Sequence, residues 1–205
     1  MVKTKGREYK PEKQYFSYKD NEIYDSARIV QIGWILIDNF DYDYTIQPEN
    51  ISCKTIKPEN FIIPEDAINI HGITNEIAEK EGIPIKKGLL KLKKNILESE
   101  YIIVYNIYYD INILLNELKR LNMNKCINKI LKLKREEKIL CIGQLCSEYA
   151  KPVNWTKYGY MVPAQTKVYN EIFKKNLVNA HNAGHDICAT IEIMYWIFSL
   201  TKLID

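Results

Sequence analysis

The sequence lacks the features that mark a secreted, zinc-binding or membrane-spanning protein. Its five cysteines are an odd set without a CxxC pair, so neither a disulfide framework nor a zinc knuckle is indicated. No early apolar run resembles a signal peptide, and no stretch approaches the roughly 20 apolar residues that a membrane span needs. These absences predict an intracellular protein, cytoplasmic or nuclear, that makes no membrane contact.

A strong net charge is also lacking. The 205 residues carry a formal charge of only +3, so bulk charge does not by itself indicate a nucleic-acid binder. The basic residues are nevertheless clustered, in residues 3–13, 86–94 and 129–138. Such clusters can face phosphates, although a solvated helix face is the commoner role of any one of them.

The order of apolar segments predicts an α/β fold in one domain. Residues 1–26 are polar and basic without a sustained period, which predicts an irregular arm or loop, and the domain proper is expected over residues 27–205. The apolar run 27–38 is typical of a strand covered on both faces. Further strands are expected over residues 42–47, 53–57, 101–106 and 138–141.

Helices are predicted after these strands. Apolar spacing indicates helices over residues 86–98, 142–150 and 164–173, one beginning near Asp110 and a last one beginning near Asp186. Residues 58–84 and 152–162 are expected to be loops. Strands first, then strands alternating with helices, favour a mixed sheet with helices on its faces.

Three polar residues lie where apolar elements begin or end, which is where α/β folds place their sites. Asp110 follows a buried-looking strand, Asp186 opens the last helix, and His181 lies in the loop before it. Taken singly, each carboxylate is as well explained as a helix-start residue that complements the macrodipole.

Four motifs in order strengthen the functional interpretation. They are Arg28-Ile-Val-Gln-Ile-Gly33, His71-Gly-Ile-Thr74, Asn106-x-x-Tyr-Asp110 and His181-Asn-Ala-Gly-His-Asp186. Over residues 27–200 the chain resembles the DEDDh exonucleases, the group that includes the proofreading subunit of bacterial replicative polymerases. The resemblance implies a ribonuclease H-like fold, a mixed five-stranded sheet flanked by helices.

The resemblance also implies roles for the three polar residues. Asp110 and Asp186 match metal-binding aspartates, and His181 matches the histidine that acts as general base. Hydrolysis of a phosphodiester needs an activated water and neutralisation of phosphate charge, which two Mg²⁺ or Mn²⁺ ions about 4 Å apart supply. Carboxylate oxygens suit these ions better than zinc, and a histidine can accept the proton of the water near neutral pH.

Substrate-binding roles follow from the same resemblance. Asn106, His71 and Ile73 resemble positions that line the substrate groove, although stabilisation of a turn or loop explains them equally well. The expected partner is a nucleic acid with a free 3′ end, and a DNA polymerase is a further partner that the family suggests.

Some positions depart from the family pattern. Cys141 stands where many members carry an aspartate, Tyr105 where a histidine often precedes the asparagine, and Tyr109 replaces the usual phenylalanine. We expect none of these to abolish catalysis. His185 competes with His181 for the base role, but the family does not use its position, so an exposed or packing histidine is expected.

The first family motif, an apolar strand ending in Asp-x-Glu, has no counterpart before Arg28. Asp20-Asn-Glu22 has the right letters but follows no apolar run, so a loop is expected there. In one hypothesis the strand belongs to an upstream segment and the complete protein is an ordinary 3′–5′ exonuclease acting on single-stranded DNA or on RNA. In another the product is an inactive module that binds nucleic acid or a polymerase. An unrelated α/β protein, whose acidic residues only cap helices, is a third alternative.

Overall fold

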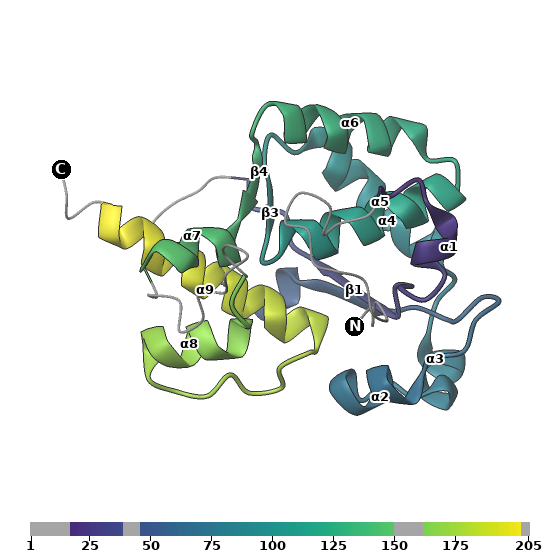
Figure 1. The fold of residues 1–205 in the computed structure, drawn as a ribbon, viewed down its shortest axis with the longest axis horizontal. Helices are drawn as coiled ribbons and strands as arrows, with labels where there is room; N and C mark the ends of the chain where they lie inside the picture. Colours follow the sequence, from purple (N-terminus) through teal and green to yellow (C-terminus); the bar gives the residue numbers. More distant parts are fainter. Residues whose placement is uncertain (1–16, 39–45, 150–161, 202–205) are drawn as a thin grey trace, which may run out of the picture.

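The computed structural model describes residues 17–38, 46–149 and 162–201, and within them it shows two small sheets (Figure 1). Strands β1 (Gln31–Trp34) and β2 (Ser52–Thr55) pair antiparallel, with Gln31 opposite Thr55. Strands β3 (Ile102–Val104) and β4 (Ile139–Cys141) pair parallel, with Ile102 opposite Ile139. The fold is therefore a mixed α/β arrangement, but the expected five-stranded sheet is not shown by the described residues.

Helices make up most of the described structure. In chain order they are α1 (Asn21–Tyr24), α2 (Glu65–His71), α3 (Asn75–Glu81), α4 (Ile85–Glu98), α5 (Ile107–Arg120), α6 (Asn124–Arg135), α7 (Ile142–Tyr149), α8 (Gln165–Phe173) and α9 (Ala183–Thr201). Figure 1 shows α4, α5 and α6 together in one group and α7, α8 and α9 in another, with β3 and β4 between the groups. No helix among the described residues is both long and apolar enough to span a membrane.

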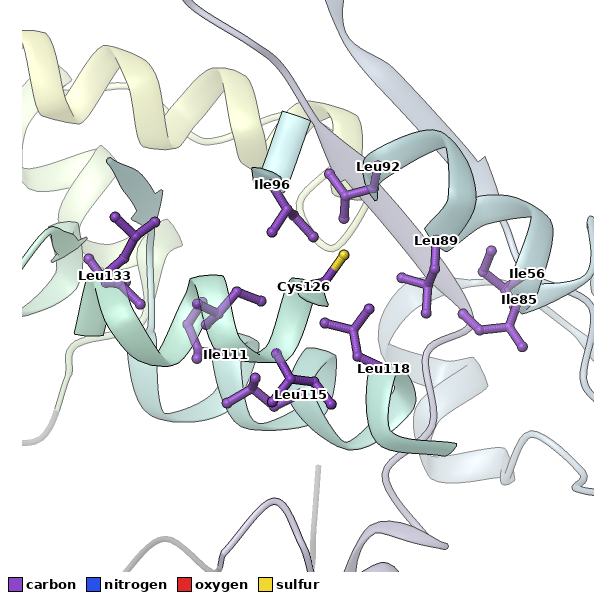
Figure 2. Packing of buried hydrophobic residues seen from close by; sticks show 13 residues of the cluster. Ile56, Ile85, Leu89, Leu92, Ile96, Ile111, Leu115, Leu118, Cys126 and Leu133 are labelled. Atoms are coloured by element: carbon purple, nitrogen blue, oxygen red, sulfur yellow. The ribbon is translucent and has the colours of Figure 1, made fainter. Parts of the chain in front are cut away.

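Each group of helices encloses its own core. Apolar side chains of α4, α5 and α6 meet in the larger one, where Leu89, Leu118 and Ile130 are fully buried, and Figure 2 shows members of this cluster pointing toward one another. Side chains from both sheets pack against this same core: Ile32, Trp34, Ile102 and Val104. The second core joins α7, α8 and α9 around Ile142 and Ile193. The two sheets therefore share one helical core, while β1 and β2 also contact α9 of the other group.

Several element boundaries differ from the sequence predictions. The first strand covers only Gln31–Trp34, and all four residues are partly buried rather than covered on both faces. Helix α5 begins at Ile107, because Asn106 caps it, and α9 begins at Ala183, so Asp110 and Asp186 lie inside first turns. Helices α2 and α3 occupy the segment expected to be a loop. Most of the strand expected over residues 42–47, and the loop expected over residues 152–162, lie outside the described residues.

Helix α6 was not predicted either, although its buried Cys126, Ile127, Ile130 and Leu133 follow a helical period. The many lysines between these apolar residues give the segment a polar composition, so its helical period is easily overlooked. The helices expected over residues 86–98, 142–150 and 164–173 are confirmed to within a residue or so, as α4, α7 and α8.

Residues just before β1 are anchored on α5. The Arg28 guanidinium donates to both carboxylate oxygens of Glu117, at 2.6 and 3.2 Å, and Glu117 is only 2% exposed. The Asn116 amide donates to the Tyr18 carbonyl oxygen at 2.8 Å. The segment before β1 therefore contacts α5 through Tyr18 and Arg28, while the predicted domain boundary at residue 27 stays a prediction.

Candidate active site

Asp110 lies in the first turn of α5, directly after β3. Asn106 caps the helix: its side-chain oxygen accepts the Tyr109 N–H at 3.4 Å, and the Asp110 carboxylate accepts the Asn106 N–H at 3.0 Å. This reciprocal pair resembles a capping box, with the carboxylate one position later than in the usual motif. Burial raises the pKa of the Asp110 carboxyl to about 6, with the nearby charge of Asp186 acting in the same direction and the Asn106 hydrogen bond opposing it.

Asp186 lies in the first turn of α9 and holds the loop that carries His181. Its carboxylate accepts the His181 N–H at 3.1 Å, and its own N–H donates to the Asn182 carbonyl oxygen at 2.9 Å. His181 is exposed and has a positive φ of 71°, an uncommon conformation for a residue with a side chain. Burial raises the pKa of Asp186, and the hydrogen bond from His181 opposes this rise.

These elements enclose a pocket of about 240 Å³. Asp186 and His181 line it from the α9 side, Asn106 and Tyr105 from the end of β3, and residues 162–166 from the start of α8. Asp110 does not line this pocket, but the charge of Asp186 contributes to its raised pKa although 76 positions separate the two aspartates in the chain. The fold therefore places His181 and Asp186 in the pocket and Asp110 within electrostatic range of Asp186.

Two glutamines, which the sequence reasoning did not single out, hold the first turn of α9 in place. The Gln31 side chain of β1 accepts the Ala183 N–H at 2.7 Å. The Gln165 side chain of α8 donates to the Asp186 carbonyl oxygen at 2.8 Å and to the Thr190 hydroxyl at 2.9 Å. Gln31 falls within the first of the four motifs, which is the signal that could have pointed to it. Gln165 carries no comparable signal.

The positions that depart from the family pattern have structural partners. The Tyr105 hydroxyl donates to the Pro163 carbonyl oxygen at 2.9 Å, and burial raises the pKa of this phenol. The Cys141 thiol donates to the Tyr105 carbonyl oxygen at 3.3 Å and accepts the Ile107 N–H at 3.4 Å. Cys141 therefore fixes the turn between β3 and α5. His185 is exposed, as expected, with its Nδ1 3.2 Å from the Asn182 side-chain oxygen.

The His71 loop lies at the edge of this site rather than in it. The His71 Nδ1 accepts the Ile73 N–H at 3.0 Å, and the Ile73 side chain is buried in a small core with Ile63 and Ala78. Burial lowers the pKa of His71, and the charge of His181 acts in the same direction, which places the two imidazoles near each other. Neither His71 nor Ile73 lines the pocket itself.

Comparison with protein families matches residues 19–194 to the RNase T family of exonuclease domains. The chain belongs to this exonuclease family. No curated protein matches the chain. Membership indicates a nuclease, and hence a nucleic-acid substrate, and exonuclease domains of this type generally use divalent metal ions.

The exonuclease site has suitable metal donors but not a complete set among the described residues. Asp110 and Asp186 offer hard carboxylate oxygens, which Mg²⁺ and Mn²⁺ prefer, and the raised pKa of each shows that a nearby positive charge would stabilise the ionised pair. Over residues 17–38, 46–149 and 162–201, however, no three His, Cys, Asp or Glu side chains come together as a metal site. The two aspartates are suitable ligand types for a metal site, but they are too few to form one by themselves.

Proposed function

We propose that the protein is a DEDDh-type 3′–5′ exonuclease, which removes nucleotides from the 3′ end of single-stranded DNA or of RNA. In this proposal Asp110 and Asp186 bind divalent metal, His181 is the general base, and Asn106 contacts the substrate. The shared pocket of His181, Asp186 and Asn106, with Asp110 electrostatically coupled to it, is the observation that carries the proposal. His71 and Ile73 are proposed to shape the groove from its edge.

The chain's own residues have distinct tasks. The His181 imidazole is exposed on a loop that the Asp186 carboxylate holds through the backbone, so it can approach a water molecule beside a bound phosphate and accept its proton. The Asn106 side chain stands at the pocket wall next to the scissile group. When bound, Mg²⁺ or Mn²⁺ would lower the pKa of the attacking water and neutralise charge on the phosphate.

We further propose that the open edges of β1 and β3 mark the place where a further strand would complete the sheet. Within the described part, β1 pairs only with β2 and β3 only with β4, yet both strands pack against the same helical core. A strand that pairs along one edge only leaves the backbone N–H and C=O groups of its other edge without hydrogen-bond partners. Leaving such groups unpaired in a sheet covered by helices costs free energy. A strand ending in Asp-x-Glu at this place would join the sheets and complete the donor set of Asp110 and Asp186.

The test uses a version of the chain that is extended before Met1 by an apolar strand ending in Asp-x-Glu. We expect it to shorten 5′-labelled single-stranded DNA stepwise from the 3′ end with Mg²⁺ or Mn²⁺. Asp110→Asn, Asp186→Asn and His181→Ala should each lower the rate by about 100-fold or more. His185→Ala is the matched control and should retain activity, because its ring contacts only loop amides.

Equal cutting in EDTA would rule out the metal-dependent mechanism. A longer chain that binds single-stranded DNA but never cuts it would instead support the inactive binding module. The 205-residue chain alone should show little or no turnover, and robust cutting by it would mean that another carboxylate pair completes the site.

A further inference from the structure

Helices α4 and α6 form a strongly basic surface away from the active-site pocket. They lie next to each other and share the larger core, where the charge of Lys93 on α4 influences Cys126 on α6. Ten of the chain's 29 lysines and arginines lie in these two helices, but only one of its 26 acidic residues, Glu98. The remainder of the chain has 19 basic and 25 acidic residues, so the net positive charge of the chain comes from these two helices.

The basic residues of this surface, hereafter the α4–α6 surface, are exposed apart from the half-buried Lys129: Lys86, Lys87, Lys91, Lys93, Lys94, Lys125, Lys129, Lys132, Lys134 and Arg135. Within the described part of the chain, only two of them form an ion pair. These are Lys94 with Glu98 at 3.9 Å and Lys132 with Glu136 at 3.7 Å. Most of the positive charge is therefore free to attract an external anion.

Lysines at the N-termini of both helices are placed against the electrostatic preference of those helices, whereas Lys132, Lys134 and Arg135 in the last turn of α6 agree with it. Lys86 and Lys87 lie in the first turn of α4 and Lys125 in the first turn of α6, and neither first turn contains an acidic residue. Positive charge is unfavourable there, because the macrodipole is positive at a helix N-terminus. Lys87 and Lys91 are also four residues apart, a spacing at which like charges repel. Helix stability does not explain this arrangement, whereas binding of an anionic partner does.

The surface also has a shape that suits a phosphate backbone. At the start of α4 there is an open hollow of about 430 Å³, lined by Pro84, Lys86, Lys87, Leu90 and Lys91. Neither α4 nor α6 contains an aromatic residue. Surfaces for single strands combine basic grooves with aromatic side chains on which bases stack. A surface without aromatic side chains contacts the phosphate backbone through its charges, independently of base sequence. This favours a duplex over a single strand as the partner.

The end of this surface is distant from the pocket. Strands β3 and β4 are parallel, α6 ends at Arg135 just before β4 begins, and Asn106 follows the other end of β3. The α6 end of the surface and the active-site pocket therefore lie at opposite ends of the strand pair. We propose that the α4–α6 surface is a second nucleic-acid contact, which binds the backbone of a duplex. The proposal takes from the proposed function only that the partner is a nucleic acid.

The test measures binding without catalysis. The full chain is titrated into a short fluorescein-labelled DNA duplex in EDTA, with KCl varied between about 50 and 200 mM, and anisotropy is recorded. Three variants each lose two positive charges: Lys87→Gln/Lys91→Gln on α4, Lys125→Gln/Lys129→Gln on α6, and the control Lys80→Gln/Lys174→Gln on exposed positions elsewhere. Circular dichroism checks that each variant is folded.

Each lost phosphate contact lowers the slope of log affinity against log salt by about 0.9. We therefore expect the α4 and α6 variants to lose roughly two units of slope and about tenfold or more in affinity, and the control to change less than about twofold. Equal losses in all three variants, or none in the first two, would overturn the proposal. The proposal would also be overturned if the α4 and α6 variants bound the duplex as the parent does but no longer bound anionic lipid vesicles. That result would assign the surface to a membrane. Because no bond is cut in this assay, its outcome is independent of the exonuclease proposal.

Discussion

The Asp110 carboxylate is predicted to lower the stability of the protein at neutral pH. Its pKa is about 6 in the folded protein, against an ordinary value of 3.8, so folding favours the protonated form. The contribution of Asp110 to stability is therefore most favourable below about pH 4 and falls as the pH rises toward 6, because the unfolded chain releases this proton first. A difference of about two units corresponds to roughly 2 to 3 kcal/mol. Asp110→Asn removes this penalty and keeps an oxygen that can accept the Asn106 N–H.

The assay is urea unfolding in EDTA at several pH values between about 4 and 8. We expect Asp110→Asn to match the parent protein near pH 4 and to exceed it by about 2 to 3 kcal/mol above pH 7. Glu59→Gln, at an exposed carboxylate, is the control and should show no such trend. A variant that is no more stable than the parent at pH 8, or whose advantage does not grow with pH, would refute the reasoning.

The remaining predictions concern packing and metal binding. Arg28→Met leaves the Glu117 carboxylate buried without its partner and should cost about 3 kcal/mol in urea unfolding, whereas Arg28→Met/Glu117→Leu should recover most of that loss. Gly33→Ala would place a Cβ 3.0 Å from the Ala183 carbonyl oxygen, so thermal unfolding should show a loss of about 1 to 3 kcal/mol and the first turn of α9 should shift. In the longer chain with its added carboxylates, Mg²⁺ should raise the melting temperature of the parent protein but not that of Asp110→Asn; an equal rise in both would exclude Asp110 as a ligand.

The sequence predicted the longer elements because their apolar periods are local. The helix over residues 86–98 could be placed from Leu89, Leu92 and Ile96 alone, and the structure confirms it as α4. The first turns of α5 and α9 were placed too late, because the prediction took each aspartate as the start of its helix. In the structure the cap of α5 is Asn106, one turn earlier. Short helices such as α2 escaped prediction because seven residues beside a proline and a glycine carry too little periodic signal.

The structure places the residues predicted to bind substrate in different surroundings. Asn106 lines the pocket, but Ile73 is buried in a separate core, since the hydrophobic contacts of α2 and α3 decide its direction. Gln165 lies outside every motif, so its hydrogen bonds to the first turn of α9 could not be foreseen.

The sequence by itself determined which residues are candidates for chemistry: two aspartates and a histidine at family spacing, and basic residues clustered in residues 86–94 and 129–138. Residue types and their local order are sufficient for that, because motifs and helical periods are properties of neighbouring residues. Only the tertiary structure decided that His181, Asp186 and Asn106 line one pocket, that burial and the charge of Asp186 raise the pKa of Asp110, and that α4 and α6 pack side by side around one core. Each of these depends on distances between segments far apart in the chain, which packing of the core sets.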